Sequence, residues 1–302
     1  MRLGLALGSG GARGWAHVGA ILALRDMGIT PDVAAGSSMG ALIGAAWAAD
    51  RLDQMEEWAR AQTRADILKH MDFSFTGGGL MRGSAVMRVL TDLGVPTRFE
   101  DLSHPLIVVA TDLTSGREVW LQQGALHDAV RGSVSIPGVV SPHWHDGKWL
   151  LDGGLTNPVP ASACRALGAD VTIAINPNAK PENTLWSRPP TPDSLWTQIA
   201  QHEVVSKLVA PLQAIIPGTA AATAAKPPVT PSYAEVVSVS IDIMAEFVRK
   251  ARAASDPPHL TLSLDLGRIG ILDMHRAGEA IDAGRALIAD HADEIRALCP
   301  QA

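Results

Sequence analysis

A serine between two glycines constrains the fold of this chain more than any other feature, in the segment Gly36-Ser37-Ser38-Met39-Gly40. The segment follows one apolar run and begins another, which is the context in which G-x-S-x-G forms a nucleophile elbow, a sharp turn from a strand into a helix. Glycine is needed on both sides because the turn forces unusual backbone angles and because a side chain would block a substrate carbonyl. The pattern predicts Ser38, not Ser37, as a nucleophile, with Gly36, Met39 and Gly40 supporting the turn.

A second glycine-rich segment lies between an expected strand at residues 3–7 and an expected helix at 15–27, and reads Gly8-Ser9-Gly10-Gly11-Ala12-Arg13-Gly14. A glycine-rich turn at the start of a helix presents backbone N–H groups to an anion. Neither common phosphate fingerprint fits, because no Gly-Lys-Ser/Thr ending is present and Arg13 stands where G-x-G-x-x-G needs glycine. Beside a serine nucleophile, the segment predicts an oxyanion hole from the amides of Gly10, Gly11 and Ala12, with Arg13 orienting the loop or adding positive field.

The third motif, Asp152-Gly153-Gly154, follows an expected strand at 149–151. A carboxylate at a strand end is well placed to accept a serine proton, and the two glycines allow close backbone approach. We expect Asp152 to be the general base. Burial would raise its pKa and make it a stronger base.

In this order and spacing the three motifs resemble those of the patatin-like phospholipases, lipid acyl hydrolases with a Ser-Asp dyad and no catalytic histidine. The resemblance covers about residues 2–176 and includes Ser135-Ile136-Pro137 and Asn157-Pro158-Val159-Pro160. It implies that Ser38 is the nucleophile, Asp152 the base and the turn from Gly10 to Gly14 the oxyanion hole. Ser9 departs from the family pattern, which often has glycine there. The implied activity is that of a serine lipid acyl hydrolase of the phospholipase A, lysophospholipase or esterase type, with no cofactor.

Other interpretations of the same residues remain open. Each motif alone is compatible with ordinary structure, such as a serine helix cap or an Asp-Gly turn. A Ser-His-Asp triad in the α/β-hydrolase order would need a histidine after Asp152, and the sequence offers four: His202, His259, His275 and His291. A metal site is not expected, because His143-Trp144-His145-Asp146 falls in an expected hairpin with no further ligand cluster. At the level of function, the alternatives are a short-chain carboxylesterase and a non-catalytic adaptor or binding protein that kept the fold.

Composition indicates a globular enzyme. The chain has 302 residues, of which 47% are hydrophobic and 19% charged, and a formal net charge of -6. This charge argues against a nucleic-acid partner and against electrostatic attraction to anionic lipid, so any transient contact with a membrane or micelle would be apolar. Cys164 and Cys299 are too few and too far apart for a disulfide framework. With no signal peptide or bilayer-spanning run in the pattern, we expect a cytoplasmic protein; its oligomeric state is not predicted.

Strands and helices alternate along the first part of the chain, which predicts a three-layer α/β/α sandwich with a mainly parallel central sheet. Continuous runs of Val, Ile, Leu and Ala predict strands covered on both faces. Gly28 and Gly168 stand where helix C-caps belong. The expected strands are 2–8, 32–36, 106–112, 118–121, 149–151 and 170–176, and the expected helices are 17–27, 38–49, 54–65, 84–93, 126–131 and 160–167.

The whole chain, 1–302, is expected to be one domain, with the catalytic core at about 1–176 and a less regular region at about 177–302. Two proline-rich segments at 177–192 and 217–231 predict loops. Between them an apolar stripe at 195–216 predicts a helix that either packs on the core or belongs to a lid at about 189–232. Further helices are expected at 233–253 and 275–298, and a strand at 259–266.

Overall fold

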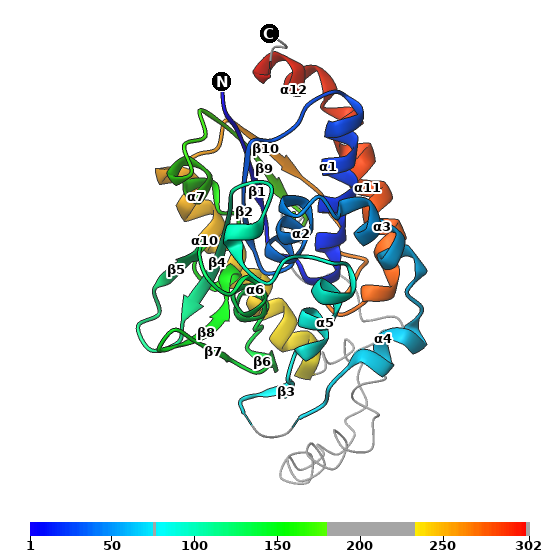
Figure 1. Ribbon diagram of the computed structural model, residues 1–302, viewed down its shortest axis with the longest axis vertical. Coiled ribbons are helices and arrows are strands. Elements are labelled where there is room, and N and C mark those ends of the chain that lie inside the picture. The colour runs from blue at the N-terminus through cyan, green and yellow to red at the C-terminus, as the bar shows by residue number, and fades with distance from the viewer. Residues whose placement is uncertain (75–76, 180–232, 300–302) are drawn as a thin grey trace, which may run out of the picture.

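A mixed sheet of eight strands forms the centre of the molecule in a computed structural model, which describes residues 1–74, 77–179 and 233–299 (Figure 1). The strand order is β10-β9-β1-β2-β4-β8-β7, and β5 also pairs with β4. The strands are β1 (Leu3–Leu7), β2 (Val33–Ser37), β3 (Gly79–Met81), β4 (Leu106–Asp112), β5 (Glu118–Leu121), β6 (Gly138–Val140), β7 (His143–His145), β8 (Lys148–Asp152), β9 (Val171–Asn176) and β10 (Leu260–Ser263). The α-helices are α1 (Ala16–Asp26), α2 (Met39–Ala48), α3 (Leu52–Ala61), α4 (Arg64–His70), α5 (Ser84–Asp92), α6 (Leu126–Ser133), α7 (Ala161–Ala166), α10 (Tyr233–Ser255), α11 (Ala277–Asp290) and α12 (Ala292–Leu298). Four short 3-10 helices are η1 (Gly11–Trp15), η2 (Phe99–Asp101), η3 (Gly153–Leu155) and η4 (Met274–Arg276).

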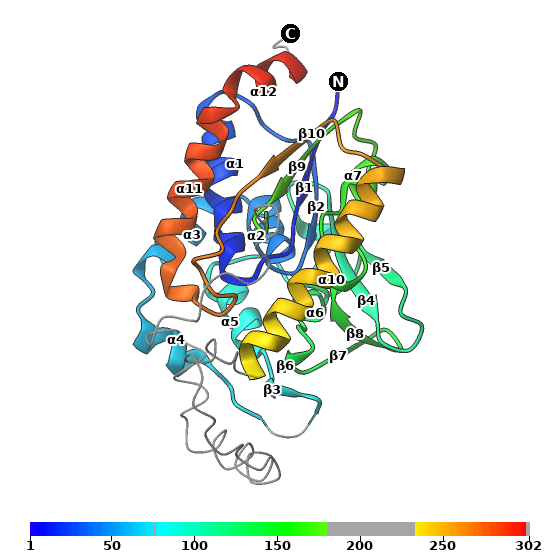
Figure 2. The same ribbon diagram turned by 180° about the vertical axis from the view of Figure 1, so that it is seen from behind.

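Helices cover both faces of the sheet. Because side chains alternate along a strand, Leu5 and Leu7 of β1 face the core under α1, α2, α6 and α11, while Ala6 faces the layer that contains α7. The second face carries α7 and the long helix α10, which crosses it diagonally (Figure 2). The three-layer sandwich is therefore confirmed, and so is the mainly parallel sheet, because β10, β9, β1, β2 and β4 pair in parallel.

The strands β2 and β8 lie on the same side of β4, and they end next to each other. Gly36 of β2 and Leu121 of β5 both pair with Val108, so β2 and β5 lie on opposite sides of β4. Ala110 pairs with both β5 and Asp152 of β8, so β8 lies on the side of β2. Since β2 runs parallel and β8 antiparallel to β4, the two strands approach each other end to end. Their last residues, Ser37 and Asp152, pair with the adjacent residues Val109 and Ala110 of β4.

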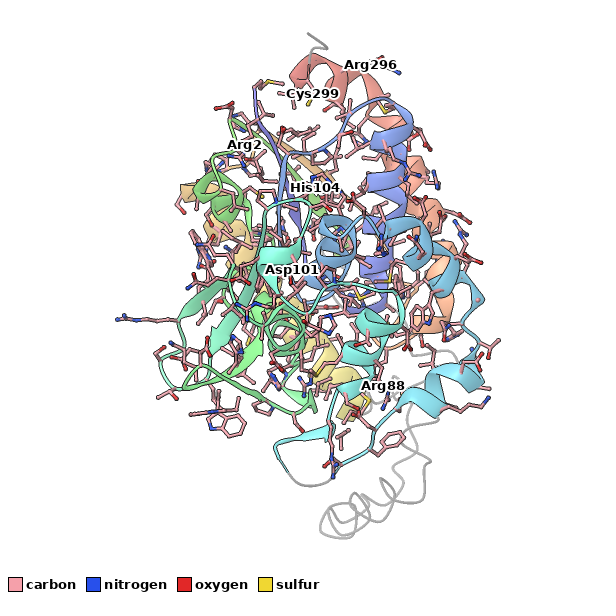
Figure 3. All side chains as sticks on the ribbon, in the orientation of Figure 1. Arg2, Arg88, Asp101, His104, Arg296 and Cys299 are labelled. Carbon is pink, nitrogen blue, oxygen red and sulfur yellow. The ribbon has the colours of Figure 1, made fainter. Side chains whose placement is uncertain are left out.

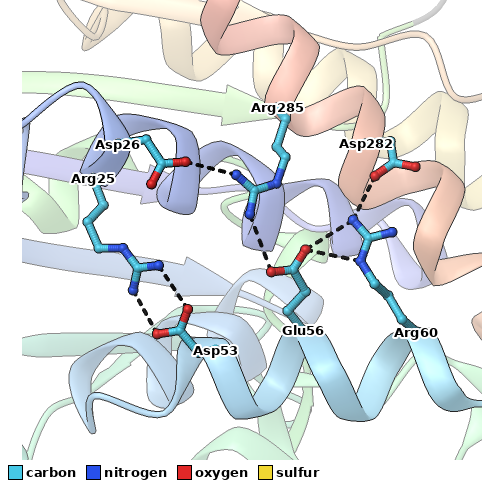
Figure 4. A network of polar contacts seen from close by, with 7 residues as sticks. All are labelled: Arg25, Asp26, Asp53, Glu56, Arg60, Asp282 and Arg285. Atoms are coloured by element: carbon cyan, nitrogen blue, oxygen red, sulfur yellow. Dashed lines mark hydrogen bonds and ion pairs between the residues drawn. The ribbon is translucent and has the colours of Figure 1, made fainter.

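Helices α1 and α11 pack with almost no space between their backbones. A Cβ atom on Gly19 would lie 1.8 Å from the Ile281 carbonyl oxygen, and one on Gly284 would lie 2.0 Å from that of Ala16. Exposed ion pairs also join α1, α3 and α11 (Figure 4). Such pairs add little stability individually, so the glycine contact and the apolar core hold the helices together.

Several sequence predictions differ from the structure in detail. The expected helix at 275–298 is wrong as a single element, because it breaks at His291, whose Nδ1 bonds the Leu287 carbonyl at 2.9 Å. The expected helix at 54–65 also ends earlier, at Ala61, and α4 follows it as a separate helix capped by Thr63. The strands β3 and β6, which form a separate two-stranded sheet, were not expected. The predicted lid at 189–232 and helix at 195–216 lie outside the described residues.

The expected C-caps are confirmed, because Gly28 and Gly168 follow helices with φ of 77° and 85°. The single domain and its boundary near residue 176 stay predictions, although β10 joins the central sheet beside β9. Cys164 and Cys299 are both free thiols. Cys299 directly follows α12 and lies far from Arg88 on α5 (Figure 3).

Candidate active site

Ser38 occupies the turn between β2 and α2 in a strained backbone conformation. Its φ of 56° and ψ of -122° lie outside the regions that non-glycine residues favour. The neighbouring glycines permit this turn: a Cβ on Gly36 would lie 2.3 Å from the Gly40 carbonyl oxygen, and one on Gly40 would lie 2.1 Å from that of Leu7. The strand-turn-helix context expected for an elbow is therefore present, and only glycine fits on either side of it.

The Ser38 hydroxyl contacts the Asp152 carboxylate directly. The distance from Ser38 Oγ to Asp152 Oδ2 is 2.5 Å, and the two residues are 114 positions apart in the chain. The second carboxylate oxygen, Oδ1, accepts the Gly154 N–H at 2.8 Å. Because both oxygens are bonded, the carboxylate has one fixed orientation, with Oδ2 toward the serine.

Burial sets the acidity of this carboxylate. Asp152 is 6% exposed and Ser38 3%. Desolvation raises the pKa of Asp152 from 3.8 to about 6, against the opposing effect of the bonds from Ser38 and Gly154. Asp152 therefore binds a proton about 100-fold more tightly than an exposed aspartate, yet it is mostly ionised at neutral pH.

Two further serines hold the elbow, a role that the sequence predicts for neither of them. The Ser133 hydroxyl accepts the Ser38 N–H at 2.8 Å and donates to the Val109 carbonyl at 2.6 Å. The Ser37 hydroxyl donates to the Asn157 carbonyl at 2.6 Å. Ser133 lies two positions before Ser135, whose carbonyl accepts the Asp152 N–H at 3.0 Å. The end of α6 thus contacts the backbones of both Ser38 and Asp152.

The glycine loop at residues 8–14 offers fewer free amides than expected. The Ala12 N–H donates to the Ile271 carbonyl at 2.9 Å, and the Arg13 N–H to Gly10 at 3.2 Å. Within the described part of the chain, the Gly10 and Gly11 amides have no hydrogen-bond partner. Gly11 has a φ of 54°, which favours glycine. The Ala12 amide, expected as one of three oxyanion donors, is therefore already bonded, whereas the Gly10 and Gly11 amides stay predicted donors.

Close contacts join the glycine loop to the other two motifs. A Cβ on Gly14 would lie 2.6 Å from Met39 Cβ, so the loop packs against the first residue of α2. A Cβ on Gly154 would lie 2.8 Å from Ser9 Oγ, which joins the loop to the turn after β8. Gly153 is equally constrained, since its Cβ would lie 2.2 Å from the Val109 carbonyl oxygen. The residues predicted from three separate segments are thus brought together at one place.

Arg13 points away from solvent into the protein. Its guanidinium forms an ion pair with Asp242 of α10, with 3.1 Å between Nη1 and Oδ2. Its Nε donates to the Ile269 carbonyl at 2.9 Å. The expectation that Arg13 orients the loop fits these contacts, whereas a field contribution would be opposed by the neighbouring carboxylate.

The histidines considered for a triad have other partners. His259 Nδ1 accepts the Thr172 N–H at 3.0 Å, and His275 Nε2 lies 3.0 Å from Arg64 Nε. His291, between α11 and α12, bonds the Leu287 carbonyl, and His202 lies outside the described residues. His17 lies nearest the glycine loop, where its Nε2 bonds the Gly8 carbonyl at 2.7 Å and burial lowers its pKa to about 4. No described histidine bonds Ser38 or Asp152.

The segment considered as a metal site forms the expected hairpin of β7 and β8. His143 Nε2 lies 3.0 Å from Asp128. Over the described ranges, no group of three His, Cys, Asp or Glu side chains is arranged to hold a metal ion. Over the same ranges, no helix combines the length and apolar character needed to cross a bilayer.

Comparison with known proteins defines the class to which this fold and site correspond. The family model described as patatin-like phospholipase matches residues 5–165, and the chain belongs to this family. Membership supports lipid acyl hydrolase activity in general terms.

Individual relatives extend the match over most of the chain. An uncharacterized NTE family protein of Mycobacterium tuberculosis, Rv1063c, is 34% identical over 95% of this chain and 90% of its own length. Human patatin-like phospholipase domain-containing protein 6 is 33% identical over 61% of this chain but only 14% of its own length. The Drosophila melanogaster protein named neuropathy target esterase sws is 34% identical over 61% of this chain and 13% of its own length.

Proposed function

We propose that this protein is a serine lipid acyl hydrolase that cleaves carboxylic ester bonds through a Ser38-Asp152 dyad and an acyl-enzyme intermediate. The observation that carries the proposal is the 2.5 Å contact between Ser38 Oγ and Asp152 Oδ2 at a strained, buried elbow. A serine cap of a helix would not need a buried carboxylate on its hydroxyl. Nucleophile and base in hydrogen-bond contact are the arrangement that acyl transfer requires.

In the first half of the reaction, Asp152 takes the Ser38 proton as Oγ forms a bond to the ester carbonyl carbon. The carbonyl oxygen becomes an oxyanion, which we assign to the amides of Gly10 and Gly11. When the bond to the leaving oxygen breaks, Asp152 returns the proton to the departing alcohol, lysophospholipid or glycerol. The acyl group stays on Ser38.

In the second half, water attacks the acyl-enzyme carbonyl and gives its proton to Asp152. The bond between the acyl carbon and Ser38 Oγ breaks, and the proton returns to Oγ as the fatty acid leaves. An aspartate with an ordinary pKa would be a weak base for either step, so the raised pKa of Asp152 supports the assignment.

An apolar cluster beside the dyad supports an acyl substrate. Ile136 adjoins Ser135, whose carbonyl accepts the Asp152 N–H, and Ile271 accepts the Ala12 N–H of the glycine loop. Both isoleucines belong to one cluster, formed with side chains of α4, β3 and β6. Apolar side chains on segments that contact Asp152 and the glycine loop suit a fatty acyl chain better than a polar acid.

Transient contact with a lipid surface is also part of the proposal. Trp144 and Trp149 are cross-strand partners on the hairpin of β7 and β8, with ring centroids 5.2 Å apart. They are 54% and 46% exposed, and the N–H of Leu113, another exposed apolar residue, donates to the Trp149 carbonyl at 2.8 Å. Tryptophan is enriched where proteins meet the membrane-water interface. Cytoplasmic location, the lack of a nucleic-acid partner and independence from any cofactor stay predictions.

The product profile on a mixed panel of phospholipids, lysophospholipids and short soluble esters tests the proposal, with Ser38→Ala as control. Release of fatty acid from the lipids by the wild type, and its loss in the variant, is the expected result. Activity confined to short esters would favour the alternative of a general carboxylesterase. If the wild type hydrolyses nothing on the panel and Ser38 is not labelled by an active-serine phosphonate, the protein is a non-catalytic member of the family.

A further inference from the structure

The side chain of Arg13 is bound entirely within the protein. Arg13 is the one charged residue of the glycine loop at 8–14, and its side chain is 6% exposed. Besides the Ile269 carbonyl, it bonds Asn178 Oδ1 at 3.0 Å and both oxygens of Asp242, at 3.3 and 3.1 Å. Asp242 is 9% exposed. All three partners lie beyond residue 165, where the match to the family model ends.

Other bonds from the same part of the chain fix the loop backbone. Asn178 Nδ2 donates to the Ser9 carbonyl at 2.7 Å, while Ile271 accepts the Ala12 N–H. The loop cannot hold its own shape, because glycine has the widest range of backbone conformations. The orientation of its free amides therefore depends on these external contacts.

We infer that Asp242 is a positioning residue for the glycine loop and acts through Arg13. This inference rests on the proposed function, in which the Gly10 and Gly11 amides bind the oxyanion. The planar guanidinium is held at Nε and Nη1 from different directions, so its position fixes the backbone of the residue that carries it. Since Arg13 directly follows Ala12, a shift of the guanidinium moves the amides that precede it.

The alternative role for Arg13 is to stabilise the oxyanion by its positive charge. A cation with a carboxylate at 3.1 Å has most of its long-range field cancelled by that carboxylate. The two roles predict opposite effects when the charge of Asp242 is removed. A positioning role predicts slower turnover, whereas a field role predicts equal or faster turnover because the Arg13 charge is no longer cancelled.

The test measures kcat, KM and thermal midpoint for Asp242→Asn and Arg13→Lys with a soluble ester. Arg13→Lys keeps the charge but loses the planar fork. We expect both variants to lower kcat by about 10- to 100-fold, because small displacements of reacting groups have effects of that size, with KM within about twofold. The rate of Ser38 labelling by a phosphonate should fall in parallel, because its P=O oxygen needs the same amides.

Arg252→Gln is the matched control. Arg252 also lies on α10, and it pairs with Glu118 of β5 at 2.6 Å without contacting the glycine loop. We expect this variant to lower the thermal midpoint while kcat stays at the wild-type value. The double variant Arg13→Met/Asp242→Leu removes both charges of this ion pair together, so it provides a folded protein if the single variants are unstable. Its kcat should be as low as that of Asp242→Asn.

Three results would overturn the inference. They are a wild-type kcat in Asp242→Asn or in the folded double variant, a wild-type kcat in Arg13→Lys, and an equal loss of kcat in Arg252→Gln. The first two would favour a field role or no role, and the third would mean that any loosening of α10 slows the reaction. Each is distinguishable from failure of the proposed function, which would appear as a lack of Ser38-dependent hydrolysis in the wild type itself.

Discussion

The buried carboxylate of Asp152 should cost the protein stability at neutral pH, and Asp152→Asn should recover it. Asparagine has nearly the same shape and can keep both contacts: its Oδ1 can accept the Gly154 N–H, and its amide can donate to Ser38 Oγ. The substitution therefore removes the charge and little else. We expect a variant that has lost ester hydrolysis by at least 100-fold and is more stable than the wild type.

The size of this effect follows from the raised pKa. The carboxyl group ionises with a pKa near 3.8 in the unfolded chain and about 6 in the folded protein. Between these values the folded state binds more protons, so its stability falls as pH rises from 3.8 to 6 and stays constant above 6. The difference corresponds to about 3 kcal/mol at pH 8 and to about half of that at pH 5.

Urea unfolding followed by circular dichroism at pH 8 and pH 5 measures this difference directly. The free energy of unfolding of Asp152→Asn should exceed that of the wild type at pH 8, by up to about 3 kcal/mol, and the excess should shrink at pH 5. Asp112→Asn is the control, because hydrogen bonds from Ser115 and Thr114 lower the pKa of Asp112. Removing this carboxylate should therefore lower the free energy of unfolding, the opposite of the effect expected for Asp152→Asn. An excess that is absent, or equal at both pH values, would refute the claim that Asp152 is a desolvated carboxylate.

Four further outcomes are expected. First, kcat/KM for a soluble ester should rise about tenfold per pH unit up to about pH 6 and then level off, since Asp152 must be ionised to accept a proton; a profile flat across pH 5–7 would exclude it as the base. Second, Ser133→Ala should lower kcat by about tenfold, as the Ser38 amide loses its acceptor, while Ser38 labelling that keeps its wild-type rate would count against this. Third, Gly40→Ala should destabilise by more than about 4 kcal/mol, because its Cβ would lie 2.1 Å from a backbone oxygen, and a thermal midpoint unchanged from the wild type would contradict the packing described. Fourth, the double variant Trp144→Ser/Trp149→Ser should bind neutral phosphatidylcholine vesicles about tenfold more weakly than the wild type, without a change in hydrolysis of a soluble ester. Vesicle binding equal to that of the wild type would place the lipid contact elsewhere.

The sequence could predict those parts of the site that depend on neighbours in the chain. The elbow, the glycine loop and the Asp-Gly-Gly turn each need glycine for reasons that act over a few residues, and each appears at a strand end as expected. The same holds for the helix C-caps at Gly28 and Gly168. Local backbone chemistry leaves a clear mark on the sequence.

Supporting contacts between residues far apart in the chain could not be predicted from the sequence. Ser133, whose hydroxyl accepts the Ser38 N–H, lies 95 positions from Ser38, and Asp242 lies 229 positions from Arg13. A serine near a helix end and an aspartate within a helix are both common, so neither residue stands out before the fold is known. The small strands β3 and β6 were missed for a related reason, because each has only three residues and so shows no clear alternation of apolar and polar side chains.

The position of Ser38 and Asp152 at strand ends gives only part of the reason that they meet. In open α/β sheets ligands bind at the carboxyl ends of parallel strands. Asp152 does end a strand, but β8 is antiparallel to β4, and in an ordinary antiparallel neighbour that end would lie at the opposite edge of the sheet. The base reaches the nucleophile because β8 occupies the place beside β4 that β2 vacates at Ser37, so that the two strands converge. The end of α6 then fixes this junction, since Ser133 bonds the backbone of Ser38 and Ser135 that of Asp152. A chain that kept the three motifs but lengthened β2 by two residues would exclude β8 from this place, and the dyad could not form.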